Sequence, residues 1–238
     1  MNKRFWAIIG VVIVAFVGML LFFAVNRGEQ PVDYGRYRRD VIKKLASEID
    51  YSQYNPDTVI AADENNGEIA EKMVGDENAP VVIYEYADYA CSHCAEFDRQ
   101  VSQILADYDG KVALVFRGFV LQFPNSMITG AAANAAAIQG YWKEYKDLLF
   151  ANQNEWYEMR GAEIKNYLEE LFKEASDGKG DVEKFRGDMA SEAVAKRMAF
   201  DYGLGEKVGL TGTPTFRVNG EAVGPTELRA VVQRMLQN

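Results

Sequence analysis

The sequence predicts an α/β fold with an inserted helical subdomain, and three observations predict it. First, a β-branched and aromatic run at 81–86 passes directly into helical spacing of apolar residues near Cys91. Second, another apolar run follows at 111–121. Third, helical patterns fill 126–206 before short strand patterns return at 215–223. The first two strands should therefore pair in parallel, through a right-handed crossover.

Composition and charge bound the class of protein. The chain has 238 residues, 48% of them hydrophobic, enough for one large domain or two small ones. Its formal net charge of −9 argues against nucleic-acid binding, because such domains are usually basic.

An apolar run from Phe5 to Val25 follows Lys3 and Arg4 near the start of the chain. About 20 apolar residues are enough to span a bilayer as a helix. The run is longer than the apolar core of a secretory signal, and its end lacks the small residues of a cleavage site. We therefore predict that residues 1–27 are an N-terminal transmembrane helix that anchors the protein in the membrane, with a cleaved signal as the alternative.

Residues 28–67 are expected to form a juxtamembrane helix and a linker. The apolar residues from Tyr37 to Ile49 fall on one helical stripe, as in a helix that packs on the domain or lies near the membrane. Pro56 and the turn Asn65-Asn66-Gly67 then predict a linker without chemistry of its own.

The remaining chain, 68–238, is expected to form one domain. A short extended segment is predicted over 68–76, and the first long helix should stop near 107–110. Helices are predicted within the inserted block over Met127–Gln139, Tyr141–Phe150, Ile164–Ala175, Asp181–Met189 and Ala193–Tyr202. Asn219-Gly220 predicts a type I′ hairpin, and Thr226 is expected to cap the final helix.

The residues with the clearest chemistry are Cys91-Ser92-His93-Cys94, at the predicted start of the first long helix. A helix N-terminus stabilises a thiolate through unpaired N–H groups and the positive end of its dipole. A zinc site would need two further ligands, and haem attachment would need histidine in place of Ala95. A structural disulfide here would close too small a loop to stabilise much. The pattern favours a redox-active disulfide and predicts no metal and no cofactor.

The charges beside the apolar run disagree about its orientation. Lys3 and Arg4 favour a cytoplasmic N-terminus, whereas Arg27 and three further arginines up to residue 39 favour the reverse. Large domains cross membranes largely regardless of charge, and disulfides persist outside the cytoplasm. We therefore expect a single-pass protein of the cell membrane with an extracytoplasmic catalytic domain.

Thr213-Pro214 supplies the second half of the pattern, because proline at the first residue of a strand tolerates a cis bond. Together with Glu85, the Cys-x-x-Cys motif and Asn219-Gly220, it resembles the DsbA-like branch of the thioredoxin superfamily over roughly residues 68–238. The resemblance implies a thioredoxin-like fold with a helical insertion at about 124–206. Residues before 68 lie outside it.

The resemblance also implies thiol–disulfide exchange on extracytoplasmic proteins, usually as an oxidase that a quinone-linked membrane partner re-oxidises. Thr213 and Pro214 would face the thiols and bind an extended substrate segment. Glu85 would relay a proton to or from Cys94, unless it is a strand-end carboxylate paired with a surface cation. Asp88 is a competitor for that role and is expected in the connecting loop.

In the expected mechanism Cys91 is the attacking and attacked sulfur, and Cys94 is the resolving thiol. His93 would stabilise the Cys91 thiolate, or else be a solvated helix residue. Family members often have proline where Ser92 stands, so the redox potential and the direction of electron flow stay open.

Two other functional classes are alternatives to a disulfide-donating oxidase. One is a reductase or isomerase on the same fold. Isomerases usually dimerise through an added domain, for which residues 28–67 are too short, so a monomer is expected. The other is a non-enzymatic chaperone or binding module. Phe123, Pro124 and Met127 are expected either to line an apolar groove for unfolded substrates or to be ordinary rim residues.

Overall fold

The computed structural model describes residues 39–120 and 123–237. The predicted anchor, Phe5 to Val25, lies outside these residues. Within them, every helix is too short or too polar to cross a bilayer.

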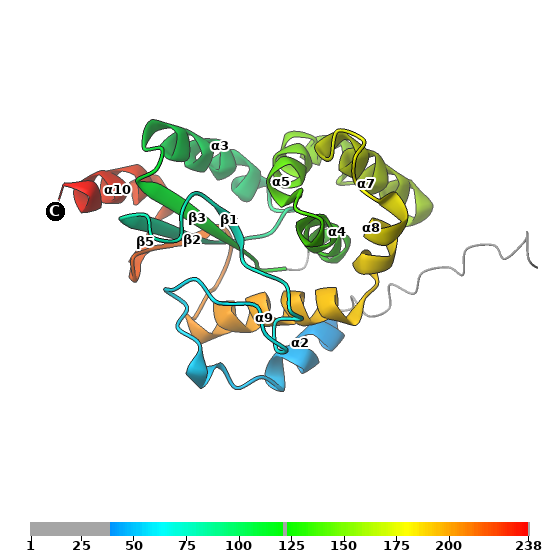
Figure 1. Ribbon diagram of the computed structural model, residues 1–238, viewed down its shortest axis with the longest axis horizontal. Helices are drawn as coiled ribbons and strands as arrows, with labels where there is room; N and C mark the ends of the chain where they lie inside the picture. Colours follow the sequence, from blue (N-terminus) through cyan, green and yellow to red (C-terminus); the bar gives the residue numbers. More distant parts are fainter. Residues whose placement is uncertain (1–38, 121–122, 238) are drawn as a thin grey trace, which may run out of the picture. The chain divides into compact units, whose positions relative to one another are not determined.

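A mixed sheet forms the centre of the fold (Figure 1). Its strands are β1 (Lys72–Val74), β2 (Val81–Ala87), β3 (Val112–Gly118), β4 (Thr215–Val218) and β5 (Glu221–Val223). Their order across the sheet is β1-β3-β2-β4-β5, so β2 is the middle strand. The predicted parallel pairing of β2 with β3 is confirmed, and β4 joins the other side of β2 antiparallel.

Helices surround this sheet and fill the long stretch between β3 and β4. They are α2 (Arg39–Ser47), α3 (Ser92–Asp107), α4 (Ser126–Ile138), α5 (Trp142–Ala151), α6 (Gln153–Trp156), α7 (Gly161–Ala175), α8 (Val182–Met189), α9 (Glu192–Lys207) and α10 (Leu228–Leu236). Short 3₁₀ turns occur at η2 (Tyr51–Gln53) and η3 (Pro225–Glu227).

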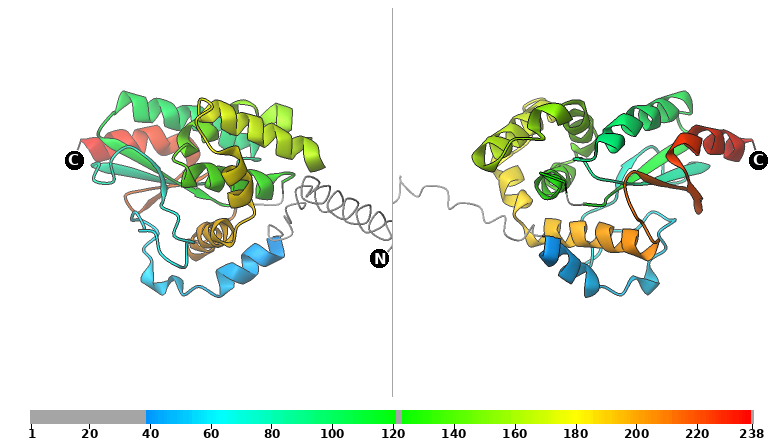
Figure 2. Two further views of the ribbon diagram at one scale, coloured as in Figure 1. Left: turned by 45° about the vertical axis from the view of Figure 1, so that its right-hand side comes forward. Right: turned by 180° about the vertical axis from the view of Figure 1, so that it is seen from behind.

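The two faces of the sheet have different covers. Helices α3 and α10 pack on one face, while α9 lies under the other with α2 outside it (Figures 1 and 2). Because successive strand residues point to opposite faces, Val81 and Ile83 join the core under α3 and α10, whereas Tyr86 joins the core shared with α2 and α9. Glu85 therefore points toward α3.

Helices α4 to α8 build a second core beside the sheet. Trp156, Phe172 and Phe185 are fully buried in it, and Phe172 stacks on Phe185 at 4.2 Å between ring centroids. The same cluster contains Cys91 and Cys94. The core of the inserted helices thus extends up to the cysteine pair.

The segment before the sheet packs closely on the domain. Ile42 of α2 is fully buried against α9, and Tyr54 and Ile60 join the same cluster. The guanidinium of Arg117 in β3 donates to the Pro56 carbonyl at 2.5 Å, which ties the stretch predicted as a linker to the sheet.

A buried charge network links the sheet edge to α9. Lys72 Nζ lies 2.9 Å from Asp201 Oδ2, and Arg197 Nη2 lies 2.6 Å from Asp201 Oδ1. Glu71 pairs with both Arg117 and Arg197, at 3.2 Å and 3.3 Å. Each member of the network is buried, so these pairs set how β1, β3 and α9 fit together.

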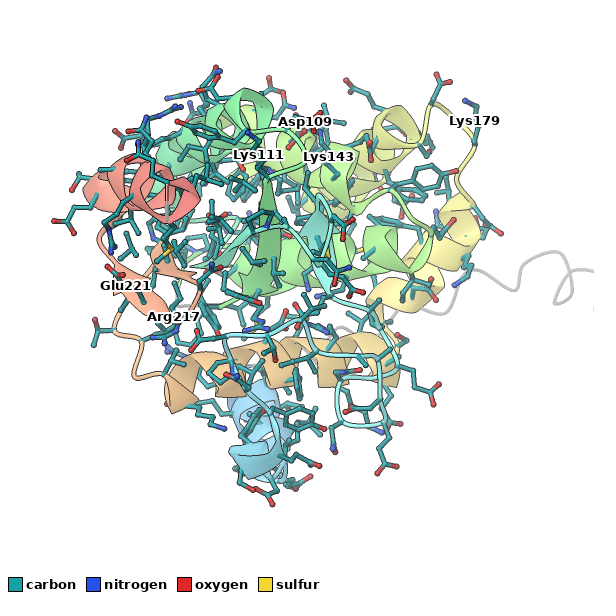
Figure 3. All side chains as sticks on the ribbon, turned by 60° about the vertical axis from the view of Figure 1, so that its left-hand side comes forward. Asp109, Lys111, Lys143, Lys179, Arg217 and Glu221 are labelled. Carbon is teal, nitrogen blue, oxygen red and sulfur yellow. The ribbon has the colours of Figure 1, made fainter. Side chains whose placement is uncertain are left out.

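The end of the domain confirms one prediction and corrects another. Asn219 and Gly220 both have positive φ, 45° and 91°, as a type I′ turn requires, and Figure 3 labels Arg217 and Glu221 on the strands either side of it. The predicted capping by Thr226 is wrong. That residue lies within the turn η3, and α10 begins at Leu228 without a side-chain cap from Glu227.

Candidate functional site

Cys91 lies at the end of the short loop that connects β2 to α3. Cys91 is the N-cap of α3, with an extended backbone at φ −82° and ψ 121°. The turn before it is formed by Asp88, whose carboxylate accepts the Ala90 N–H at 2.9 Å and whose carbonyl accepts the Cys91 N–H at 3.0 Å. This Asx-type turn ends the strand and starts the helix at Cys91. Asp88 thus lies in the connecting loop, as predicted.

The two thiols are unbridged and differ strongly in environment. A hydrogen bond from the Cys94 thiol, joined by the Thr213 side chain and the backbone N–H groups of Cys94 and His93, outweighs burial and lowers the pKa of Cys91 to about 5. Cys94 is fully buried one turn inside the helix, and burial raises its pKa well above that of a free thiol. Cys91 is therefore the sulfur that carries negative charge at neutral pH.

The loop before β4 covers the reactive sulfur from the other side. Cys91 Sγ lies 3.4 Å from the Thr213 carbonyl oxygen, and the Thr213–Pro214 peptide bond is cis. The Thr213 hydroxyl oxygen is buried and has no hydrogen-bond partner among the described residues. Its O–H is free to point at a thiolate, consistent with its lowering effect on the pKa of Cys91.

The imidazole of His93 lies at the protein surface. The side chain is 74% exposed, and Nδ1 lies 3.6 Å from Glu96 one turn along α3. The contact of His93 with the thiolate is through its backbone N–H. A tuning role for the ring stays a prediction.

Glu85 is a buried acid on the face of β2 that points toward α3. It is fully buried, and neither carboxylate oxygen has a hydrogen-bond partner among the described residues. Burial raises the pKa of Glu85 to about 8, against the opposing effect of Lys146. The carboxyl of Glu85 is therefore largely protonated at neutral pH. It can donate this proton and later take one up again.

A buried ion pair that the sequence analysis did not identify lies near this acid. Lys146 Nζ of α5 binds the carboxylate of Asp98, four residues after Cys94 on α3. Of the two lysines on this part of α5, Lys146 is buried, and Lys143, one turn away and labelled in Figure 3, is exposed. The signal available in the sequence was the i, i+4 spacing from Cys94 to Asp98, which places both on one helical face.

Other predicted features lie at the rim. Phe123 is 38% exposed and Met127 is half-buried, and their role in a groove stays a prediction. The part of the chain that the structure describes contains no group of three or more His, Cys, Asp or Glu side chains that could hold a metal ion.

The low pKa of Cys91 predicts an unusual pH profile. Because only the thiolate is a nucleophile, alkylation of Cys91 by iodoacetamide should have its midpoint at about pH 5. The rate should reach a plateau by about pH 6, whereas an ordinary thiol keeps gaining reactivity to about pH 9. His93→Ala serves as the control that separates the ring from its backbone N–H. A wild-type midpoint near that of free cysteine would contradict this account of the site.

Replacing Glu85 tests the buried acid. Its pKa is raised on folding, so the native state holds a proton that the unfolded chain releases, and stability falls as pH rises from about 4.5 to about 8. Glu85→Gln should remove this decline, so at pH 8 the variant should be more stable than the wild type by roughly 3 kcal/mol. Its rate of thiol–disulfide exchange should fall. Urea unfolding at pH 5 and pH 8 measures the difference in stability, with exposed Glu174→Gln as the control. Parallel declines in wild type and Glu85→Gln would show that Glu85 is not the cause.

Comparison with known families gives a match over most of the chain. The family model described as thioredoxin matches residues 68–237. Among curated proteins, one named Na⁺/H⁺ antiporter NhaA 3 from Salinispora tropica is 36% identical over 160 residues, which cover 66% of this chain and 23% of that protein. A Na⁺/H⁺ antiporter NhaA from Herminiimonas arsenicoxydans is 29% identical over 158 residues, 66% of this chain and 24% of that protein. The chain thus spans about a quarter of these relatives' length.

Solved structures of similar fold include one that is described as a thioredoxin-like oxidoreductase. A thioredoxin-like oxidoreductase from Silicibacter pomeroyi has a TM-score of 0.58 at 25% identity, covering 74% of this chain and 95% of that one. BdbD from Bacillus subtilis has a TM-score of 0.62 at 20% identity, covering 76% and 98%. α-DsbA1 from Wolbachia pipientis has a TM-score of 0.59 at 20% identity, covering 70% and 91%. The fold is therefore thioredoxin-like, with DsbA-like structural neighbours.

Proposed function

Because the chain belongs to the thioredoxin family, we propose that it is a protein thiol–disulfide oxidoreductase that uses Cys91 and Cys94. The observation that carries the proposal is the contrast between the two sulfurs. Cys91, at the helix start beside the Thr213 carbonyl, has a pKa of about 5, whereas burial raises that of Cys94. Cys91 is thus suited to form a disulfide with a substrate, and Cys94 is suited to remain buried in the helix.

The direction we propose is donation of a disulfide. A substrate thiolate attacks Cys91 Sγ of the oxidised pair, the Cys91–Cys94 bond breaks, and Cys94 leaves with the electron pair and takes up a proton. A second substrate thiolate then attacks the substrate sulfur of the mixed disulfide and releases the Cys91 thiolate. The pair gains two electrons and the substrate becomes a disulfide. Because the Cys91 thiolate is stabilised, the reduced form is favoured and the pair is oxidising.

Glu85 supplies the proton in this proposal. Cys94 leaves as a thiolate in a buried position, where an uncompensated charge is costly. A neutral Glu85 inside the sheet, with a pKa of about 8, is the acid placed to neutralise it, directly or through water. Lys146 nearby stabilises the carboxylate that remains.

The proposed substrate rests on the loop before β4, and the proposed location rests on the N-terminal sequence. The backbone around Thr213 and Pro214 is proposed to pair with an extended segment of a protein substrate by strand addition. The apolar run at 5–25 is proposed to anchor the chain in the cell membrane with the domain outside, where a quinone-linked membrane partner re-oxidises the monomer.

The deciding experiment is the equilibrium of the cysteine pair against a glutathione buffer, with the full chain in detergent. A disulfide donor should give a potential near about −120 mV, the range of strong oxidants, rather than about −270 mV, the value of a general reductant. A potential at the reducing end would overturn the oxidase and favour a reductase that needs electrons from across the membrane.

A further inference from the structure

Gln153 contacts the backbone of the reactive cysteine from the inserted helices. It opens the short helix α6, and 9% of the residue is exposed. Its Nε2 donates to the Tyr89 carbonyl at 2.6 Å and to the Cys91 carbonyl at 3.1 Å. A primary amide nitrogen carries two N–H groups, so both are used on carbonyls one residue either side of Ala90.

We propose that Gln153 is a positioning residue for the exchange reaction, which holds the main chain around Ala90 so that the Cys91 sulfur stays at the start of α3. The inference rests on the proposed function. The Cys91 carbonyl also accepts the Ala95 N–H at 3.2 Å, the first helical bond of α3. By binding this carbonyl as well as that of Tyr89, Gln153 restricts rotation of Cys91 away from the helix N–H groups that stabilise its thiolate.

The length and chemistry of glutamine suit this position. A lysine or arginine would place an unpaired cation in a buried site at high cost, and an apolar residue would leave two buried carbonyls without this donor. Two other side chains of the inserted helices bind different parts of this loop. Ser126 donates to the Asp88 carboxylate at 2.7 Å, and Trp142 donates to the Tyr89 hydroxyl at 2.9 Å. Of these three side chains, Gln153 is the one that binds the backbone of Cys91 itself.

The test compares the full-length wild type with Gln153→Met, which keeps the length of the side chain and removes both donors. The control is Tyr145→Phe, which removes a buried hydrogen bond to the Leu168 carbonyl inside the same helices and leaves the cysteine loop untouched. Thiolate formation is followed by ultraviolet absorbance and by iodoacetamide alkylation over a pH series. For Gln153→Met the midpoint should move to higher pH, and alkylation below the wild-type midpoint should fall about fivefold, the usual effect of one or two lost hydrogen bonds.

Tyr145→Phe should lower the unfolding midpoint without moving the titration. If the titration of folded Gln153→Met coincides with that of wild type, Gln153 only supports the fold and the proposal is wrong. Should Gln153→Met not fold, Gln153→Glu keeps the size of the side chain. At the acidic pH of the titration its buried carboxyl is protonated and can donate to only one of the two carbonyls, so the midpoint should move in the same direction by a smaller amount. The titration needs no substrate, so it tests the role of Gln153 separately from the proposed function. The proposed function fails if the wild type catalyses no thiol–disulfide exchange.

Discussion

Cys91→Ser is expected to abolish thiol–disulfide exchange, lowering the rate by more than about a thousandfold. Serine keeps the N-cap position at the start of α3, so the fold should survive. It cannot form a disulfide with a substrate, and Cys94 cannot replace it because that thiol is fully buried and its pKa is raised. The measurement is oxidation of a reduced model protein by stoichiometric enzyme. Ser92→Ala, on the neighbouring exposed residue, is the matched control and should remain active.

Cys94→Ser gives the complementary result. Cys91 keeps its place at the helix start, but a mixed disulfide that forms on it is no longer attacked from within the protein. Such adducts should therefore accumulate and be visible on non-reducing gels. Full activity in Cys91→Ser would contradict the exchange mechanism and favour a chaperone or binding module with an incidental thiol pair.

Asp201→Asn is expected to cause the largest loss of stability, about 3–5 kcal/mol. The carboxylate lies between Lys72 and Arg197, and although burial opposes it, these two cations keep the pKa of Asp201 lowered. The amide would leave the buried Lys72 without its counter-charge, and Arg197 would keep only its pair with Glu71. Since the folded pKa is lowered, this stabilisation is present at neutral pH and is lost as pH falls through that pKa.

Urea denaturation at pH 7 measures the loss. The control is Asp177→Asn, which breaks an exposed pair with Lys179 and should cost less than about 0.5 kcal/mol. Asn also tolerates the positive φ of 52° at this position. Equal midpoints for the two variants would mean that the buried network contributes no more than a surface pair.

Local patterns predicted most of the elements that hold the site. The change from strand to helical spacing put the cysteine pair at the start of α3, and the structure makes Cys91 the N-cap. The β-branched and aromatic composition of residues 81–86 put Glu85 on an inner strand, and it is fully buried. Both results depend on neighbours within a few residues of the chain, where periodicity is informative.

The residues that sequence patterns missed act across long separations. Lys146 and Asp98 are 48 positions apart, and Gln153 and Cys91 are 62 apart. A lysine on an amphipathic helix or a glutamine at a helix start carries no local mark of burial. The four-residue helix α6 is too short to show a period, and the burial of Tyr54 depends on its edge-to-face contact with Phe200 of α9. These contacts form only when the helices pack together, so the local sequence pattern does not show them.

The position of β4 in the sheet has a consequence for biosynthesis. Cys91 and the Thr213 carbonyl that covers it are 122 positions apart, with α4 to α9 between them. A chain made from its N-terminus therefore exposes both thiols to other oxidants and nucleophiles during the synthesis of more than half of the domain. Only when the last strands join β2 does the Thr213 carbonyl cover Cys91, so the newly made protein must pass through a stage at which its own cysteines are as open to attack as those of any unfolded protein.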